Sequence, residues 1–318
     1  MSRFDPYEHL GIRLNPDGTA TRLSHYPNTD ANPGVIPGLP TVSKDVTVNG
    51  ETKVWARIFL PTKLPSNDNT VARLPILFYF HGGGFAFYSA ANLSTHQPCS
   101  ALASEVPAVI IAVNHRLAPE HRLPAQYDDA IDTILWVKKQ AVDPEGEKWL
   151  RDYGDFTRCY LGGRGSGGNI AFHAALRALN YDIKPLNIIG IFMNQPMFGG
   201  KQRMPSELKY ATDQLIPLPA LDLLWELALP KGTDRDHRFC NPLENGPYKS
   251  KVSSIGRCLV IAFNMDPMLD RLQAFVETLV KQGVQVEARF DVVGFHDIDL
   301  VDTQRSQALL NIIKEFII

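Results

Sequence analysis

The chain has 318 residues, of which 44% are hydrophobic and 21% charged, and its formal net charge at pH 7 is −2. This composition is typical of a soluble globular protein, and the near-neutral charge argues against nucleic acid or an anionic membrane as a partner. No apolar signal segment stands at the N-terminus and no apolar run reaches membrane-spanning length, so we expect a cytoplasmic protein.

The first part of the chain predicts irregular structure followed by a hairpin. Residues 1–40 are rich in Pro, Asn and Asp, and residues 15–18 (Asn-Pro-Asp-Gly) have the composition of a turn. Residues 46–60 alternate between apolar and polar side chains around Asn49-Gly50, a pair that favours a hairpin turn. We therefore expect an irregular cover up to residue 40 and two paired strands after it.

The rest of the chain alternates between strand-like and helix-like segments. Apolar runs of strand length occur at residues 74–80, 108–114, 158–162, 188–193, 258–263 and 284–290. Helical periodicity occurs at residues 128–140, 169–179, 270–281 and 303–318. Buried strands that alternate with helices predict an α/β fold, in which a mostly parallel sheet is covered by helices on both faces.

Residues 200–250 interrupt this alternation. They contain many Pro and Gly residues, no strand-like run and one clear helical pattern at residues 219–229. We expect this helical insertion and residues 1–40 to form a cap over the site. The whole chain, residues 1–318, is then a single domain.

A glycine-dense turn stands between the strand-like run at residues 158–162 and the helical pattern that begins at residue 169. It reads Gly-Arg-Gly-Ser-Gly at residues 163–167. A strand–turn–helix of this kind raises the central residue of a GxSxG motif to the top of the sheet, where it serves as a nucleophile. The central position here is Gly165, which has no side chain that could attack a substrate.

A second glycine-rich segment follows the strand-like run at residues 74–80. It reads His-Gly-Gly-Gly-Phe at residues 81–85. Consecutive glycines let the backbone approach a ligand and point N–H groups at it, as in the HGGG loops that form part of an oxyanion hole. The remaining donor of such a hole is the N–H of the residue after the elbow, Ser166, which does not depend on a side chain.

Acid and base candidates follow the last two strand-like runs. Residues 263–270 (Phe-Asn-Met-Asp-Pro-Met-Leu-Asp) stand where the acid of a Ser–Asp–His chain order belongs, and an Asp there orients a His. Asp270, the second acid of this segment, is expected to cap the following helix. Gly294-Phe295-His296 follows the final strand, and we expect His296 to be a general base.

Together these segments resemble the plant carboxylesterase family, in the hormone-sensitive-lipase branch of the α/β hydrolases. The resemblance covers nearly the whole chain and includes the blocks at residues 116–125 and 127–130. It implies the α/β-hydrolase fold, a triad acid and base, and three backbone donors of an oxyanion hole. The implied residues are Asp266, His296, Gly83, Gly84 and Ser166. The family's elbow usually reads Gly-Asp/Ser-Ser-Ala-Gly-Gly-Asn, so Gly165 takes the nucleophile position.

The departures from the family pattern predict local consequences. Gly adopts positive φ without strain, so Gly165 should leave the turn intact. Arg164 stands where the family commonly has an acid or a Ser; we expect a surface or ion-pairing Arg, the alternative being a pair with an acidic substrate group. The Ser166 side chain should point away from the apex and cap the helix or lie in the turn, rather than meet His296.

A histidine that is oriented by a carboxylate, faces N–H donors and lacks a nucleophile is a proton-transfer site. It suits elimination, isomerisation, epimerisation or cyclisation, and the resembled family includes dehydratases and alkaloid cyclases. One alternative is an ester hydrolase that uses Ser166. The other is a non-catalytic binding protein, although the similar gibberellin receptors typically keep the elbow Ser and lose the His, the reverse of this chain.

The expected ligand is a small hydrophobic metabolite that contains a ring. The residues expected to contact it are His81, Phe85, Phe87, Tyr88 and Arg164, together with cap residues 200–230. The four cysteines form no metal or redox motif, and we expect neither a metal nor a cofactor. The sequence does not indicate an oligomeric state.

Overall fold

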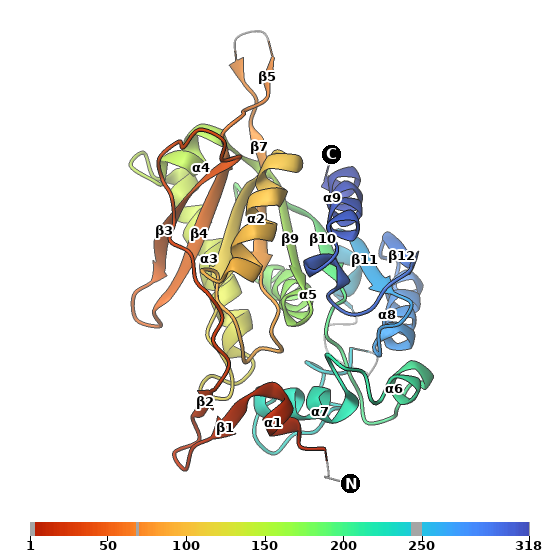
Figure 1. Cartoon of the computed structure of the whole chain (residues 1–318). Helices are drawn as coiled ribbons and strands as arrows, with labels where there is room; N and C mark the ends of the chain where they lie inside the picture. Colours follow the sequence, from red (N-terminus) through yellow and green to blue (C-terminus); the bar gives the residue numbers. More distant parts are fainter. Residues whose placement is uncertain (1–3, 68–69, 243–249, 318) are drawn as a thin grey trace.

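The computed structural model describes residues 4–67, 70–242 and 250–317 (Figure 1). Its centre is an eight-stranded sheet. In spatial order the strands are β12 (Val286–Val292), β11 (Arg257–Phe263), β10 (Ile188–Asn194), β9 (Gly154–Arg164), β7 (Leu74–Phe80), β8 (Val109–Asn114), β4 (Val54–Pro61) and β3 (Thr41–Asn49). The β3–β4 and β4–β8 pairs are antiparallel and the other neighbours parallel, which confirms the mostly parallel sheet predicted from the sequence.

Helices pack on both faces of this sheet, as the alternation of apolar runs and helical patterns predicts. Among the helices that contribute to the core on one face are α3 (Ala125–Val142), α5 (Ser166–Ala178) and α8 (Leu269–Lys281). Those on the other face are α2 (Leu93–Glu105) and α9 (Thr303–Ile317). Because side chains alternate across a strand, Phe78 and Phe80 of β7 join the first core and Leu77 and Tyr79 the second.

Helix α2 is absent from the sequence predictions. Pro98 stands inside it, and a proline normally interrupts a helix. The helix nevertheless buries Cys99, Leu102 and Ala103 against the second core. Tertiary packing therefore outweighs the local signal at this position.

Short hairpins lie at the edges of the sheet. The expected turn at residues 15–18 joins β1 (Ile12–Leu14) to β2 (Ala20–Arg22), which pair antiparallel. The hairpin expected around Asn49 joins β3 to β4, and the Asn49 side chain accepts the N–H groups of Glu51 and Thr52 at the turn. A further small hairpin, β5 (Ser66–Asn67) and β6 (Thr70–Val71), precedes β7.

The insertion between β10 and β11 lies at one end of the sheet, beside the N-terminal segment (Figure 1). It contains α6 (Pro205–Lys209), α7 (Leu218–Ala228) and the short helix η1 (Val252–Ser254). Helix α1 (Pro6–Leu10) contacts α7. Of the insertion, residues 243–249 lie outside the described ranges.

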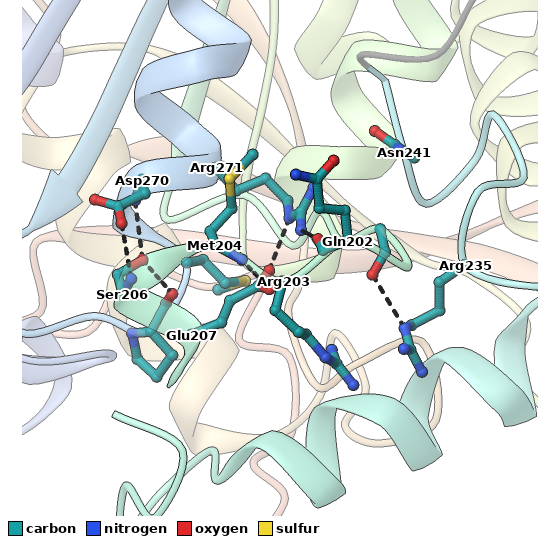
Figure 2. Close-up of polar contacts among 12 residues, drawn as sticks. Gln202, Arg203, Met204, Ser206, Glu207, Arg235, Asn241, Asp270 and Arg271 are labelled. Carbon is teal, nitrogen blue, oxygen red and sulfur yellow. Dashed lines mark hydrogen bonds and ion pairs between the residues drawn. The ribbon is translucent and has the colours of Figure 1, made fainter. Parts of the chain in front are cut away.

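Figure 2 shows how α6 of the insertion is tied to α8. The buried Arg271 donates from Nε to Glu207 Oε1 at 2.7 Å, and both side chains are almost fully enclosed. Asp270 was expected to cap α8; instead it lies in the first turn of α8 and its Oδ2 accepts the N–H of Ser206 at 2.7 Å. The expectation was wrong because α6 brings its unpaired N-terminal N–H group to this carboxylate.

Within the described ranges no helix is long and apolar enough to cross a membrane. The same ranges hold no cluster of three or more His, Cys, Asp or Glu side chains that could bind a metal ion. All four cysteines are buried free thiols, and those of Cys159 and Cys258 lie in core strands.

Candidate active site

A cavity of about 390 Å³ lies where the parallel strands end. It is formed by segments that are far apart in the sequence. They are the N-terminal residues His9, Leu10, Ser24 and Tyr26, the glycine loop from His81 to Gly84, the turn residues Arg164, Gly165 and Ser166, the insertion residues Leu215, Ile216, Leu221 and Leu224, and the loop residues Phe295, His296 and Asp297. Both segments expected to act as a cap therefore contribute to the walls.

The turn between β9 and α5 places Gly165 at its apex. Gly165 has φ 52° and ψ −121°, a conformation that side chains rarely adopt. A Cβ added there would have one heavy atom within reach, Gly82 Cα at 4.0 Å. The apex thus faces open space in the cavity, and a side chain at this position would project into it.

Asp266 and His296, which follow different strands, meet beside this apex. His296 Nδ1 lies 2.7 Å from Asp266 Oδ2, and His296 is only 8% exposed. The fully buried Asp266 also accepts the Met268 N–H at 2.8 Å. With Nδ1 engaged by the carboxylate, His296 presents Nε2 as its remaining proton-exchanging atom.

Gln195, which sequence reasoning missed, holds this pair in place. Its Nε2 donates to Asp266 Oδ2 at 3.0 Å, and its Oε1 accepts the Asp297 N–H at 3.1 Å. Gln195 adopts φ 49°, which is uncommon for a residue with a side chain and concentrates at functional sites. The only sequence signal for it is its position directly after the apolar run of β10.

Two carboxylates act on the pKa of His296. Burial lowers this pKa, but the charges of Asp266 and Asp297 outweigh burial and raise it from 6.5 to about 9. A raised pKa favours the imidazolium at neutral pH, which can donate a proton; the neutral ring, which can accept one, becomes more populated as the pH rises towards about 9.

The raised pKa of His296 has a consequence for stability. Folding stabilises the imidazolium form of His296. We therefore expect His296 to contribute fully to the free energy of unfolding below its ordinary pKa of 6.5, and we expect this contribution to be lost as the pH rises through about 9. Urea unfolding of the wild type and of His296→Gln across this range measures it. The wild type should lose stability relative to the variant as the pH rises; a difference that stays constant with pH would contradict the assignment.

Arg164 is buried, contrary to the surface position expected for it, and forms ion pairs, as expected. It is 7% exposed; it pairs with Asp299 and its Nε lies 3.5 Å from Asp297 Oδ1. Asp297 directly follows His296 and is the N-cap of η2 (Ile298–Leu300), and Asp299 lies within η2, so the turn after β9 is bound to the segment that follows the histidine. This tertiary contact, invisible in the sequence, draws the guanidinium inward.

Ser166 is the first residue of α5. Its side chain was expected to cap that helix or to lie in the turn, and it does not cap the helix. The N-cap is Gly165, and Ser166 Oγ has no hydrogen-bond partner among the described residues although Ser166 is 1% exposed. Ser166 instead lines the cavity. No hydrogen bond joins it to His296 in the described part of the chain.

The glycine loop reverses direction directly after β7. Gly83 has φ 98°, and a Cβ there would lie 2.5 Å from Phe87 O, so only glycine fits. Within the described ranges the N–H groups of Gly83 and Gly84 donate to no protein acceptor, and the N–H of Ser166 belongs to the first turn of α5. The glycine loop and the N-terminus of α5 therefore leave backbone N–H groups available to bind an oxygen atom of a ligand.

His81 is a buried wall of the cavity. Its Nδ1 lies 2.8 Å from Gly82 O, and its ring stacks on His115 at 4.0 Å. Burial, together with His115, lowers the pKa of His81 well below its ordinary value, so the ring is neutral. Its Nε2 has no partner among the described residues.

The aromatic residues after the glycine loop differ in their placement. Phe87 and Tyr88 line the cavity, as expected. Phe85 does not: it is fully buried in the core, with its ring centroid 5.4 Å from that of Trp225. The expectation was wrong because the loop turns back at Gly83 and directs Phe85 inward.

Comparison with known proteins gives consistent similarities. A sequence model described as alpha/beta hydrolase fold matches residues 77–299. Probable carboxylesterase 9 of Arabidopsis thaliana is 55% identical over 315 residues, which cover 99% of this chain and 97% of that protein. A 3-O-acetylpapaveroxine carboxylesterase of Papaver somniferum is 42% identical, covering 98% of this chain and 99% of that one. A fungal esterase structure from Rhizomucor miehei superimposes with a TM-score of 0.74 at 23% identity, over 89% of this chain and 84% of that one.

Proposed function

Because this chain belongs to the alpha/beta hydrolase fold family, in its plant carboxylesterase-like branch, we propose that it uses that scaffold for proton transfer rather than ester hydrolysis. The expected fold is thereby confirmed, and the relatives are carboxylesterases by name. The reaction proposed here goes further than the family assignment and depends on the geometry of the turn.

The observation that carries the proposal is Gly165 at the apex, in the conformation of a nucleophile elbow. Without a hydroxyl at this point no acyl-enzyme forms there. His296 Nε2 and the N–H groups of the glycine loop remain. A histidine can move a proton next to a carbonyl or at a heteroatom while N–H donors hold the developing oxyanion.

These groups support elimination, isomerisation, epimerisation or cyclisation of a small hydrophobic metabolite. The cavity wall is largely apolar, with Leu221, Leu224 and Phe87 among its residues. A substrate carbonyl placed against the N–H groups would bring its neighbouring carbon towards His296. A cytoplasmic location remains part of this proposal.

Ester hydrolysis by Ser166 is the second candidate. Two observations favour it: Ser166 lines the cavity and its Oγ has no hydrogen-bond partner among the described residues, and the relatives are carboxylesterases by name. Against it stand the missing hydrogen bond to His296 and the position of Ser166 one residue beyond the apex. A hydroxyl without a base is a weak nucleophile.

Labelling with a fluorophosphonate, followed by intact-mass measurement, separates the two candidates. We expect no adduct on the wild type, because Ser166 is not activated by His296. Turnover of a panel of ring-containing metabolites is then measured for the wild type, His296→Gln and Ser166→Ala. Loss of the acid–base group should lower the rate about 10²- to 10⁴-fold, whereas Ser166→Ala should retain most of it.

Two results would overturn the proposal. A stoichiometric adduct that is absent in Ser166→Ala would identify an esterase with a displaced serine. Equal loss of turnover in His296→Gln and Ser166→Ala would show that His296 does not act alone as the proton-transfer group. His296→Gln keeps a polar side chain of similar size, so its folding can be compared directly with that of the wild type.

A further inference from the structure

Five charged groups gather at one side of the cavity. They are Arg164, Asp266, His296, Asp297 and Asp299. Three carboxylates thus face one guanidinium and one imidazole. The summed charge is −1 when His296 is protonated and −2 when it is neutral. This side of the cavity therefore carries surplus negative charge in either state.

Hydrogen bonds and ion pairs show which of the three carboxylates has the least compensated negative charge. Asp266 is satisfied by the Met268 N–H, Gln195 and His296. Asp299 is enclosed and its Oδ2 pairs directly with Arg164, although its Oδ1 has no hydrogen-bond partner among the described residues.

Asp297 differs from both because it has no close ion pair. Its Oδ1 has no hydrogen-bond partner among the described residues, and its nearest cationic atoms are Arg164 Nε at 3.5 Å and His296 Nε2 at 3.9 Å. Both distances exceed that of a charge-assisted hydrogen bond. Asp297 is also the one of these three carboxylates that lines the cavity.

We propose that the cavity binds an organic cation, a protonated or quaternary amine on an apolar ring body, and that Asp297 receives its positive charge. Asp297 shares the Arg164 guanidinium with Asp299, which pairs with it more closely, so the charge of Asp297 is incompletely compensated and a ligand cation would offset it. An anionic ligand would gain little from Arg164, which Asp297 and Asp299 already neutralise. It would also be repelled by Asp297.

Two further features of the wall fit such a ligand. Ser166 and His81 line the cavity and are more than nine-tenths buried, and in the described part of the chain Ser166 Oγ and His81 Nε2 have no hydrogen-bond partner. Since Nδ1 of the neutral His81 is engaged with Gly82 O, its Nε2 is an acceptor for an N–H donor. Tyr26 and Tyr88 pack edge to face at 4.6 Å on the same wall, and aromatic rings attract organic cations.

This inference rests on the proposed function, whose substrate class it names. The Oδ1 of Asp297 lies 3.9 Å from His296 Nε2, so an ammonium held by Asp297 stands beside the proton-transfer group. The chemistry would then occur at or near the carbon or nitrogen that bears the charge.

Three probes of matched shape test the charge preference by isothermal titration at neutral pH. They are N-methyl-1,2,3,4-tetrahydroisoquinoline, a cation; isochroman, its neutral counterpart; and 1,2,3,4-tetrahydronaphthalene-2-carboxylate, an anion. We expect the wild type to bind the cation at least about tenfold more tightly than isochroman, and the anion most weakly. Equal affinities for the cation and isochroman, or no binding of the cation, would overturn the inference.

Asp297→Asn is the matched variant, because Asn tolerates the left-handed conformation of this residue, φ 61° and ψ 18°. It should reduce the cation preference to less than about threefold while changing the affinity for isochroman little. Asp152→Asn, an exposed carboxylate on α4 (Lys148–Tyr153), is the control and should leave the preference unchanged. A preference that survives Asp297→Asn would also overturn the inference.

The binding measurement involves no turnover, so the two proposals can fail separately. Cation preference without turnover of any amine in the metabolite panel would overturn the proposed function alone. Turnover of neutral metabolites without cation preference would overturn only the inference about the substrate.

Discussion

Gly165→Ser should create a serine esterase on this chain. The new side chain would start at an apex whose nearest other heavy atom, Gly82 Cα, is 4.0 Å from the Cβ position. It would project into the cavity that His296 lines, and His296 is already oriented by Asp266 at 2.7 Å. A serine raised at this point and a histidine held by an acid are the parts of a triad.

We expect the gain to be large. Removal of a triad nucleophile costs about six orders of magnitude in subtilisin. Its restoration should raise p-nitrophenyl acetate hydrolysis by at least about 10³-fold over the wild type near pH 9, where enough His296 is neutral to act as the base. The variant should also form one fluorophosphonate adduct. The backbone at residue 165 has φ 52°, so a side chain there should cost about 1–3 kcal/mol in stability.

Gly165→Ala is the matched control, since it introduces the same backbone strain without a hydroxyl. It should be destabilised equally and remain inert. Addition of His296→Gln to Gly165→Ser should remove the new activity. If Gly165→Ser melts at the same temperature as Gly165→Ala and hydrolyses no ester, His296 and Asp266 are not in working geometry.

Arg271→Met should destabilise the protein more than any surface substitution. Arg271 is 1% exposed, donates to Glu207 at 2.7 Å and to Gln202 O at 2.8 Å (Figure 2). Removing it leaves the carboxylate of Glu207 buried without a counter-charge. Breaking a buried ion pair in this way costs about 3–5 kcal/mol, which urea unfolding would measure.

Two comparisons identify the cause of that loss. Arg203→Met breaks the more exposed pair with Asp222, also in this region, and should cost at most about 1 kcal/mol. The double variant Arg271→Met/Glu207→Leu replaces both charges with apolar groups and should recover much of the stability. A loss that is equally large for Arg203→Met would show that cap attachment, rather than an unpaired carboxylate, is responsible.

A hydrogen bond of α6 also connects the insertion to the loop of the catalytic acid. Ser206 Oγ of α6 donates to Pro267 O at 2.8 Å, directly after Asp266. The cap segment that lines the cavity is therefore fixed to the loop that carries the acid. We attribute the position of α6 to these polar contacts, since its short helix has little apolar surface of its own.

The regular elements were predictable because their signal is local. Strand β7 is a continuous apolar run, and such a run can be buried on both faces only inside a covered sheet. Helices α5 and α8 follow periodic patterns of apolar residues. Helix α2, with Pro98 inside it, has a contrary local signal and was missed.

At the site, local sequence patterns were enough to identify the residues that follow each strand. Gly165 after β9, the glycine loop after β7 and His296 after β12 can be read without a structure, because parallel strands bring their carboxyl ends to one edge. Their order in the chain also suggests that Asp266 serves His296, which the structure places 2.7 Å apart.

The arrangement of the charges and of the remaining side chains, in contrast, results from the tertiary structure. It buried Arg164 between Asp297 and Asp299, turned Phe85 into the core, and brought Gln195 against Asp266. These contacts join segments that share no local pattern. The sequence shows which charged groups are present. Which of them meet depends on how the loops pack in three dimensions, and this packing determines the charged groups that gather at the cavity.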